Sequence, residues 1–201
     1  DHKDAFLDTD TLEKARGITI FSKQALLTAG NTDITLLDTP GHVDFSTETE
    51  RTLQVLDYAV LVVSGTDGVQ SHTETLWRLL RRYHVPTFVF VNKMDLPGKS
   101  REELLAQLNH RLGEGFVAFD VPQADRDEAL ALCDENLMDR MLDAGQLTDA
   151  DIILAVARRH VFPCWFGSAL RRTENDVLES VDALLDGIDR YTRPACLLYT
   201  S

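Results

Sequence analysis

Three short segments of the chain contain residue types that could hold a phosphorylated ligand. The first is segment 38–42, of sequence DTPGH. The carboxylate of Asp38 can hold a magnesium ion, commonly through water, because that ion takes hard oxygen partners. Gly41 has no side chain to obstruct a phosphate, so its backbone N–H could reach a terminal phosphoryl oxygen. The alternative is a plain turn after a strand, since Asp, Pro and Gly are common turn residues.

The second segment is 92–95, of sequence NKMD. A fixed carboxylate at Asp95 can accept hydrogen bonds from the ring N–H and the exocyclic amine of guanine, a donor pair that adenine lacks. The aliphatic stem of Lys93 could cover one face of the base, while Asn92 could tie neighbouring loops together. Taken alone, this motif is only suggestive.

The third segment is Ser168-Ala169-Leu170, whose backbone N–H groups could receive the carbonyl oxygen of guanine. By itself this tripeptide is a weak signal. Each of the three segments, however, directly follows an expected strand of a parallel sheet. Because the carboxyl ends of such strands meet at one edge, we expect the segments to converge there as a guanine nucleotide site.

The elements that must position these segments alternate apolar strands with amphipathic helices. This pattern predicts an α/β fold with a doubly wound, mostly parallel sheet. The expected strands are residues 18–27, 34–37, 58–64, 87–91 and 161–166. Segments 58–64 and 87–91 are continuous apolar runs, so we expect both to be buried on both faces of the sheet.

The expected helices are marked by periodicity and by capping residues. The first expected helix is residues 72–84, and the second begins with the caps Ser100 and Glu103 and ends at Gly113. An acidic helical insertion follows at about 114–160, with Thr148 capping its final helix. A last helix is expected around 177–185.

The motifs together resemble those of the translational GTPases. The sequence KARGITI at 14–20, followed by DTPGH, NKMD and GSAL, is similar to the GTP-binding domain of elongation factor G and of the tetracycline-resistance ribosomal protection proteins. The resemblance implies a P-loop GTPase-like domain that binds GTP or GDP with Mg²⁺ and hydrolyses GTP on the ribosome. It assigns magnesium to Thr19, orientation of the attacking water to His42, and guanine to Asn92, Lys93, Asp95 and Ser168. The roles of Asp38, Ala169 and Leu170 rest on the residue types and positions described above.

One detail indicates which branch of this family the chain resembles more. Segment 137–151 is similar to the helical insertion that precedes the last guanine-binding loop of elongation factor G and the ribosomal protection proteins. The insertion is shorter here than in the elongation factor. This difference favours the ribosomal protection branch.

The phosphate-binding loop of the family, G-x-x-x-x-G-K-[ST], is absent from the 201 residues. Gly98-Lys99-Ser100 has the right last three residues, but Lys93 stands where the first glycine is required, so we reject it. We expect the loop to lie upstream in the parent protein, and the chain alone to bind nucleotide weakly. The alternative is a truncated, non-catalytic remnant that keeps the fold and does not hold nucleotide.

Composition limits which other functions the chain could have. A formal net charge of −13 argues against a broad nucleic-acid-binding face, so any RNA contact must be local. No run approaches the roughly 18 apolar residues that a membrane helix needs, and we expect a cytoplasmic protein. Cys133, Cys164 and Cys196 are widely spaced, which is typical of reduced packing residues. We assign 1–194 to the GTP-binding domain, and leave 195–201 unassigned, with extraneous sequence as one explanation.

Overall fold

The computed structural model describes residues 24–38, 52–170 and 179–192. The chain forms two compact units, Asp1–Leu56 and Asp57–Ser201. Each unit is described by itself.

The described part of the first unit is a hairpin. Strands β1 (Gln24–Ala29) and β2 (Thr32–Leu37) pair antiparallel, with Ala29 opposite Thr32. Gly30 makes the turn at φ 55°, a conformation that glycine adopts without steric cost. The sequence interpretation placed Asp38 after a strand of the parallel sheet, and this is corrected here: its strand, β2, belongs to the hairpin. The Gly-Asn pair at 30–31 was the signal for a two-residue turn.

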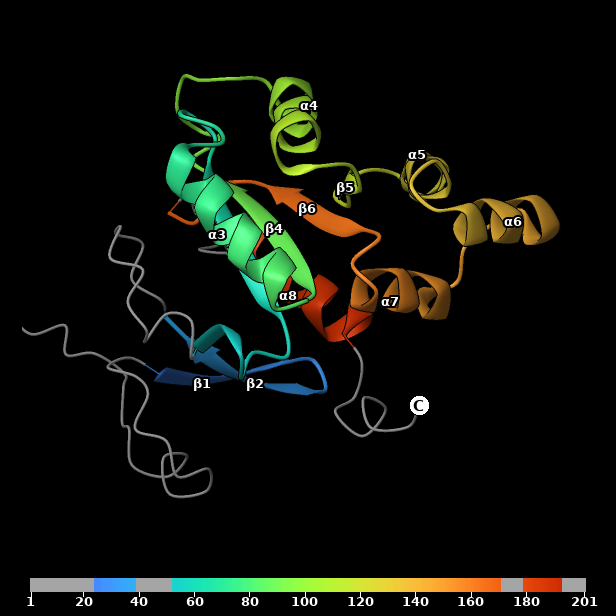
Figure 1. Cartoon of the computed structure of the whole chain (residues 1–201), viewed down its shortest axis with the longest axis horizontal. Coiled ribbons are helices and arrows are strands. Elements are labelled where there is room, and N and C mark those ends of the chain that lie inside the picture. Colours follow the sequence, from blue (N-terminus) through green and yellow to red (C-terminus); the bar gives the residue numbers. More distant parts are fainter. Residues whose placement is uncertain (1–23, 39–51, 171–178, 193–201) are drawn as a thin grey trace, which may run out of the picture. The chain divides into compact units, whose positions relative to one another are not determined.

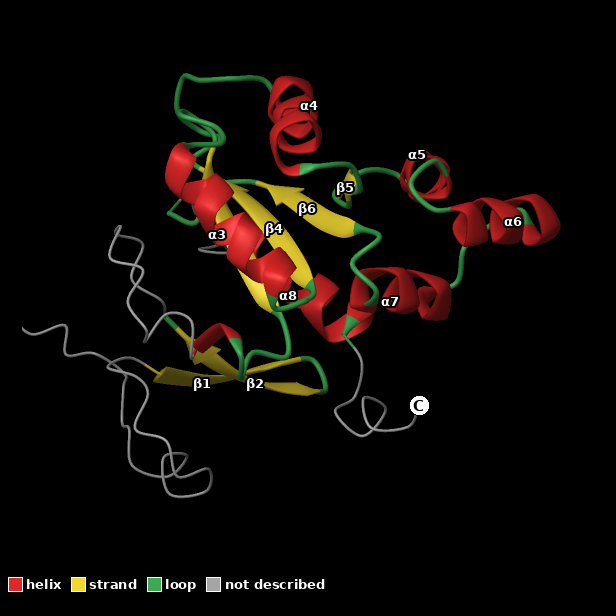
Figure 2. Ribbon diagram, viewed as in Figure 1, coloured by secondary structure: helices red, strands yellow, loops and turns green. Residues whose placement is uncertain are grey.

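The second unit is an α/β layer structure built on a parallel sheet of order β3-β4-β6-β5 (Figures 1 and 2). Its elements are β3 (Ala59–Ser64), α3 (Ser71–Arg82), β4 (Thr87–Asn92), α4 (Arg101–Leu112), β5 (Phe116–Ala118), α5 (Gln123–Ala131), α6 (Glu135–Ala144), α7 (Asp149–Ala157), β6 (Phe162–Phe166) and α8 (Glu179–Tyr191). The expected strands 87–91 and 161–166 are confirmed, and so are the expected helices, apart from the start of the insertion.

Helices cover both faces of this sheet. On one face, the Trp77 ring of α3 lies with its centroid 4.6 Å from that of Phe162 and 5.0 Å from that of Phe116. Trp165 is three residues beyond Phe162 and therefore points to the opposite face. There α8 packs so closely that a Cβ added at Gly187 would come within 2.2 Å of the Trp165 ring. This arrangement confirms the doubly wound prediction.

Two expectations about the strands need correction. Strand β3 is not buried on both faces, because Val60 and Val62 remain 38% and 57% exposed while Leu61 and Val63 are buried. β3 is an edge strand in the described part of the sheet, and an apolar run does not reveal how many of its faces are covered. Residues 116–118 form β5 rather than the start of the insertion, whose helices begin at Gln123.

Local capping explains where α6 begins and ends and where α7 begins. The Thr148 side chain accepts the backbone N–H of Asp151 at the start of α7, as expected. Asp134 caps α6 by accepting the N–H groups of Asn136 and Leu137, and Gly145 ends it in the left-handed conformation. Likewise, Ser100 accepts the N–H of Glu103 at the start of α4.

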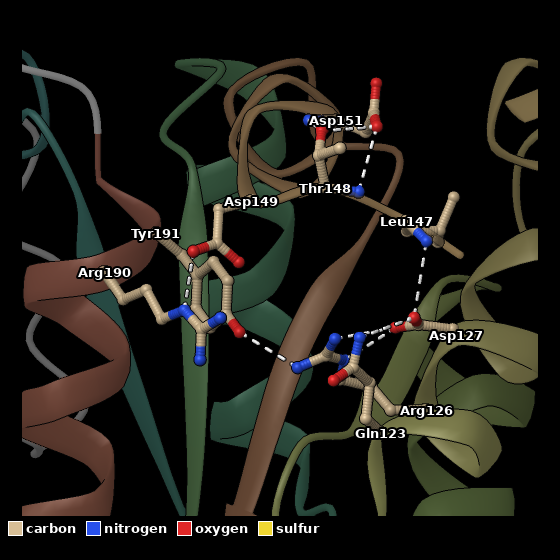
Figure 3. A network of polar contacts seen from close by, with 9 residues as sticks. All are labelled: Gln123, Arg126, Asp127, Leu147, Thr148, Asp149, Asp151, Arg190 and Tyr191. Atoms are coloured by element: carbon tan, nitrogen blue, oxygen red, sulfur yellow. Dashed lines mark hydrogen bonds and ion pairs between the residues drawn. The ribbon is translucent and has the colours of Figure 1, made fainter. Parts of the chain in front are cut away.

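A buried polar network joins the insertion to the last helix (Figure 3). Arg126 donates to the Asp127 carboxylate at 2.7 Å and to the Tyr191 hydroxyl at 3.0 Å. Asp127 in turn accepts the backbone N–H of Leu147, in the loop before α7. Because Arg126 and Asp127 are only 8% and 2% exposed, each charge depends on the other for its stability in the interior.

The cysteines among the described residues are unpaired packing residues. Cys164 is buried in β6 and Cys133 is half-buried. Burial raises the pKa of both thiols, with nearby Asp120 adding to the effect at Cys164 and Glu114 at Cys133. Both thiols therefore stay protonated near neutral pH, which makes them poor nucleophiles.

Candidate functional site

Two of the predicted motifs meet at the carboxyl edge of the parallel sheet. Asn92 is the last residue of β4, and its side-chain oxygen accepts the backbone N–H of Lys93 at 2.8 Å and of Ala169 at 2.9 Å. Segment 92–95 is thereby joined to segment 168–170, which follows the neighbouring strand β6. The tie that the sequence predicted for Asn92 is present.

Backbone hydrogen bonds continue this contact. Met94 donates its N–H to the oxygen of Gly167 at 3.1 Å, and Gly167 donates to the oxygen of Val91 at 2.9 Å. A Cβ at Gly167 would lie 2.1 Å from that of Ser180, so glycine is required where α8 crosses the loop. The two segments are therefore held by β4, β6 and α8 together.

The polar groups of this edge face outward. Lys93 and Asp95 are exposed, whereas Ser168 and Ala169 are half-buried. Leu170 is 93% exposed. The carboxylate of Asp95 and the loop 168–170 are thus accessible to a ligand, on the side of the sheet where α/β proteins bind ligands.

Lys93 has a strained backbone. Its φ of 65° lies in the left-handed region, which costs a residue other than glycine roughly 1 to 3 kcal/mol. Such a conformation persists only where surrounding contacts impose it, and the hydrogen bond from its N–H to Asn92 is one of these contacts. Strain of this kind is common in ligand-binding loops.

The sequence interpretation passed over a third loop at the same edge, residues 64–68 after β3. Gly65 donates its N–H to the backbone oxygen of Asn92 at 2.7 Å, so the loop lies directly beside segment 92–95. Hydrogen bonds from the hydroxyls of Ser64 and Thr66 lower the pKa of Asp67, and the charges of Lys93 and Lys99 act in the same direction. Its position could have indicated that this loop belongs to the site, because it follows β3, the strand next to β4 in the sheet.

The predicted phosphate and magnesium residues fall in the first compact unit. Asp38 is exposed directly after β2, in the first compact unit. Thr19, Gly41 and His42 lie outside the described residues, so their roles stay predictions. Within residues 24–38, 52–170 and 179–192, no group of three or more His, Cys, Asp and Glu side chains is placed to hold a metal ion.

Comparison with known proteins identifies the family. A family model described as the elongation factor Tu GTP binding domain matches residues 1–194. The chain belongs to this GTP-binding domain family. Membership confirms the resemblance to translational GTPases.

Curated relatives of this GTP-binding domain include resistance proteins and a translation factor. The tetracycline resistance protein TetM of Streptomyces lividans is 38% identical over 193 residues, covering 87% of the chain and 30% of the relative. The oxytetracycline resistance protein of Streptomyces rimosus is 38% identical over 207 residues, covering 90% and 30%. Elongation factor G 1 of Desulfotalea psychrophila is 32% identical over 237 residues, covering 93% and 33%. The chain spans about a third of the length of these relatives.

A solved structure supports the fold. A crystal structure of a protein from Thermus thermophilus matches 93% of the chain and 34% of its own chain, with a TM-score of 0.72 and 24% identity. At that identity the likeness concerns the fold alone. None of the described helices of this GTP-binding domain is long and apolar enough to cross a lipid bilayer.

Proposed function

We propose that the chain binds GTP and GDP and hydrolyses GTP, as the GTP-binding domain of a translation factor that works on the ribosome. The observation that carries the proposal is the double hydrogen bond of Asn92, which places segment 92–95 beside 168–170. Both segments belong to a domain whose family is described as GTP-binding. The whole parent protein would act in the cytoplasm.

In this proposal the base is selected at the carboxyl edge of the sheet. Asp95 accepts the ring N–H and the exocyclic amine of guanine, and backbone N–H groups of Ser168 and Leu170 donate to its carbonyl oxygen. The N–H of Ala169 is already bound by the side chain of Asn92, so Ala169 would shape the loop rather than donate to the base. The exposure of Asp95 supports this role, because an exposed side chain is accessible to a ligand. Adenine lacks both donors, so a bound adenine nucleotide would leave the Asp95 carboxylate without its hydrogen bonds and would bind much more weakly.

The phosphate end of the nucleotide would be served by the residues that the sequence motifs predict for it. Asp38 offers an exposed carboxylate, the hard oxygen donor that Mg²⁺ prefers, so it fits the ion that the family implies. When bound, Mg²⁺ neutralises charge on the phosphates. Thr19 would hold the ion with Asp38, Gly41 would contact the terminal phosphate through its N–H, and His42 would orient the attacking water.

We further place the chain nearer the resistance proteins than elongation factor G. Identity to the two resistance proteins is 38%, against 32% to the elongation factor. The alignment to the elongation factor spans 237 positions, more than the 201 residues of the chain, so the elongation factor contains residues that the chain lacks. A shorter insertion is consistent with this difference.

The test is nucleotide competition in the full-length product of the gene. A fluorescent GDP analogue is bound in the presence of Mg²⁺, then displaced by GDP, GTP or ADP, and GTP hydrolysis is measured with and without ribosomes. We expect displacement by GDP and GTP, none by ADP at the same concentrations, and faster hydrolysis with ribosomes. Equal displacement by ADP would exclude guanine selection, while a complete lack of binding would favour the non-catalytic remnant.

A further inference from the structure

Gly98-Lys99-Ser100 resembles the end of a phosphate loop in sequence, but the structure gives each residue another role. Ser100 caps α4: its hydroxyl accepts the N–H of Glu103 at 3.2 Å, and its own N–H donates to the Glu103 carboxylate at 2.8 Å. Gly98 and Lys99 instead contact the loop 64–68 after β3.

Gly98 permits a contact between two backbones. A Cβ at this position would lie 2.9 Å from the oxygen of Gly65 and 2.9 Å from the Cα of Thr66. Both are main-chain atoms, which cannot move aside as the end of a side chain can. On the other side of the same contact, a Cβ at Gly65 would meet the sulfur of Met94 at 2.7 Å. Loop 64–68 is therefore packed between the two ends of segment 92–99.

Lys99 fastens this packing with a hydrogen bond. Its ammonium group donates to the backbone oxygen of Asp67 at 3.1 Å. The acceptor is itself well placed, because the Asp67 carboxylate accepts the hydroxyls of Ser64 at 2.8 Å and Thr66 at 3.0 Å. Loop 64–68 thus has its own internal structure, against which Lys99 can hold the following segment.

Asp95 lies between two anchors. Before it, Asn92 holds the segment to Ala169, and after it, Gly98 and Lys99 hold the segment to loop 64–68. The strained backbone of Lys93 needs such restraint on both sides. Loss of the second anchor would leave the Asp95 carboxylate free to move.

We propose that Gly98 and Lys99 are positioning residues that set the preference for guanine by fixing the segment that carries Asp95. The inference rests on the proposed function, because it assumes that Asp95 binds the base. Two hydrogen bonds to one carboxylate need a fixed carboxylate plane, and small misplacements of a binding group are costly. The bond to the exocyclic amine distinguishes guanine from hypoxanthine, which has the ring N–H but no amine.

The experiment compares GDP with inosine diphosphate in the full-length gene product. Lys99→Met keeps a side chain as long as the aliphatic stem of lysine and removes the ammonium donor, whereas Lys99→Arg restores a donor. Arg158→Met removes one exposed positive charge from the end of α7 and serves as the control. Gly98→Ala is the second way to break the contact.

We expect Lys99→Met to weaken GDP binding by about three- to tenfold, the effect of one hydrogen bond, with less than about a twofold change for inosine diphosphate. The preference for GDP should fall accordingly, Lys99→Arg should restore it, and Arg158→Met should leave it unchanged. Gly98→Ala should lower the preference for GDP over inosine diphosphate at least as far as Lys99→Met does. An equal loss for both nucleotides, or no loss for either, would overturn the proposal.

Amide hydrogen exchange without nucleotide separates this inference from the proposed function. In Lys99→Met the amides of Gly65 and Met94 should exchange faster than in the parent, while amides in α7 should not change. If the parent protein shows no preference for GDP over ADP, the proposed function fails, and the exchange data still show whether Lys99 holds the segment. If the parent prefers GDP but neither exchange nor the preference responds to Lys99→Met, the positioning role is wrong.

Discussion

Replacing Asn92 with alanine tests the contact that joins the two guanine segments. One side-chain oxygen accepts two backbone N–H groups, from Lys93 at 2.8 Å and Ala169 at 2.9 Å, in a half-buried position. Alanine would leave both N–H groups without this acceptor. At about 0.5 to 1.5 kcal/mol for each bond, we expect a loss of about 1 to 3 kcal/mol. This corresponds to a weakening of GDP binding by a factor of about 5 to 160 if the ordered segments are what the nucleotide binds.

The assay has two parts. Urea denaturation of Asn92→Ala gives the change in the free energy of unfolding, and competition with a fluorescent analogue gives the dissociation constant for GDP. Asn92→Asp is the matched variant for stability, because a carboxylate oxygen can accept the same two N–H groups. Normal GDP affinity in Asn92→Ala would refute the reasoning, and so would equal destabilisation by the two variants.

Three other predictions concern the insertion and the catalytic assignment. Asp127→Ala leaves Arg126 buried without its carboxylate partner and should lower the free energy of unfolding, measured by urea denaturation, by about 3 to 5 kcal/mol. Arg190→Ala breaks the exposed pair with Asp149 and should lower it by about 0 to 1 kcal/mol. Similar values for the two variants would contradict the argument from burial. Burial opposes ionisation of Asp134, but hydrogen bonds from His160 and from backbone N–H groups outweigh it and lower the pKa, so stability should be lost as pH falls below about 4, and Asp134→Ala should show a weaker loss over this range. His42→Ala should slow ribosome-stimulated GTP hydrolysis by about a hundredfold or more while GTP affinity stays nearly intact, and equal single-turnover rates would remove His42 from the catalytic assignment.

Local signals in the sequence predicted much of the second unit. Ser100 and Thr148 were recognised as caps because a capping residue acts on its own first turn, and the structure shows both. The strands around 87–91 and 161–166 were recognised as short apolar runs. From these two strands the meeting of segments 92–95 and 168–170 followed, because neighbouring parallel strands end at the same edge.

Features that depend on distant neighbours were missed. Gly65 and Gly98 matter because two loops approach closely, and neither residue reveals this in its own segment. Strand β5 has three residues, too few for a periodic pattern. The exposure of Val60 and Val62 depends on what covers β3, which an apolar run does not specify. The resemblance of Gly98-Lys99-Ser100 to a phosphate loop, in contrast, could be rejected from the sequence, because Lys93 stands where the first glycine of that loop is required.

The most direct test of guanine recognition is to exchange the hydrogen-bonding pattern of Asp95. Asparagine at this position would offer one acceptor and one donor, which match xanthine, whose ring N–H stands beside a carbonyl in place of the amine. The measurement is the ratio of dissociation constants for xanthosine diphosphate and GDP in the full-length parent and in Asp95→Asn. We predict that the parent prefers GDP by about a hundredfold or more and that Asp95→Asn prefers xanthosine diphosphate. An unchanged preference for GDP in Asp95→Asn would contradict the assignment of Asp95 to the base.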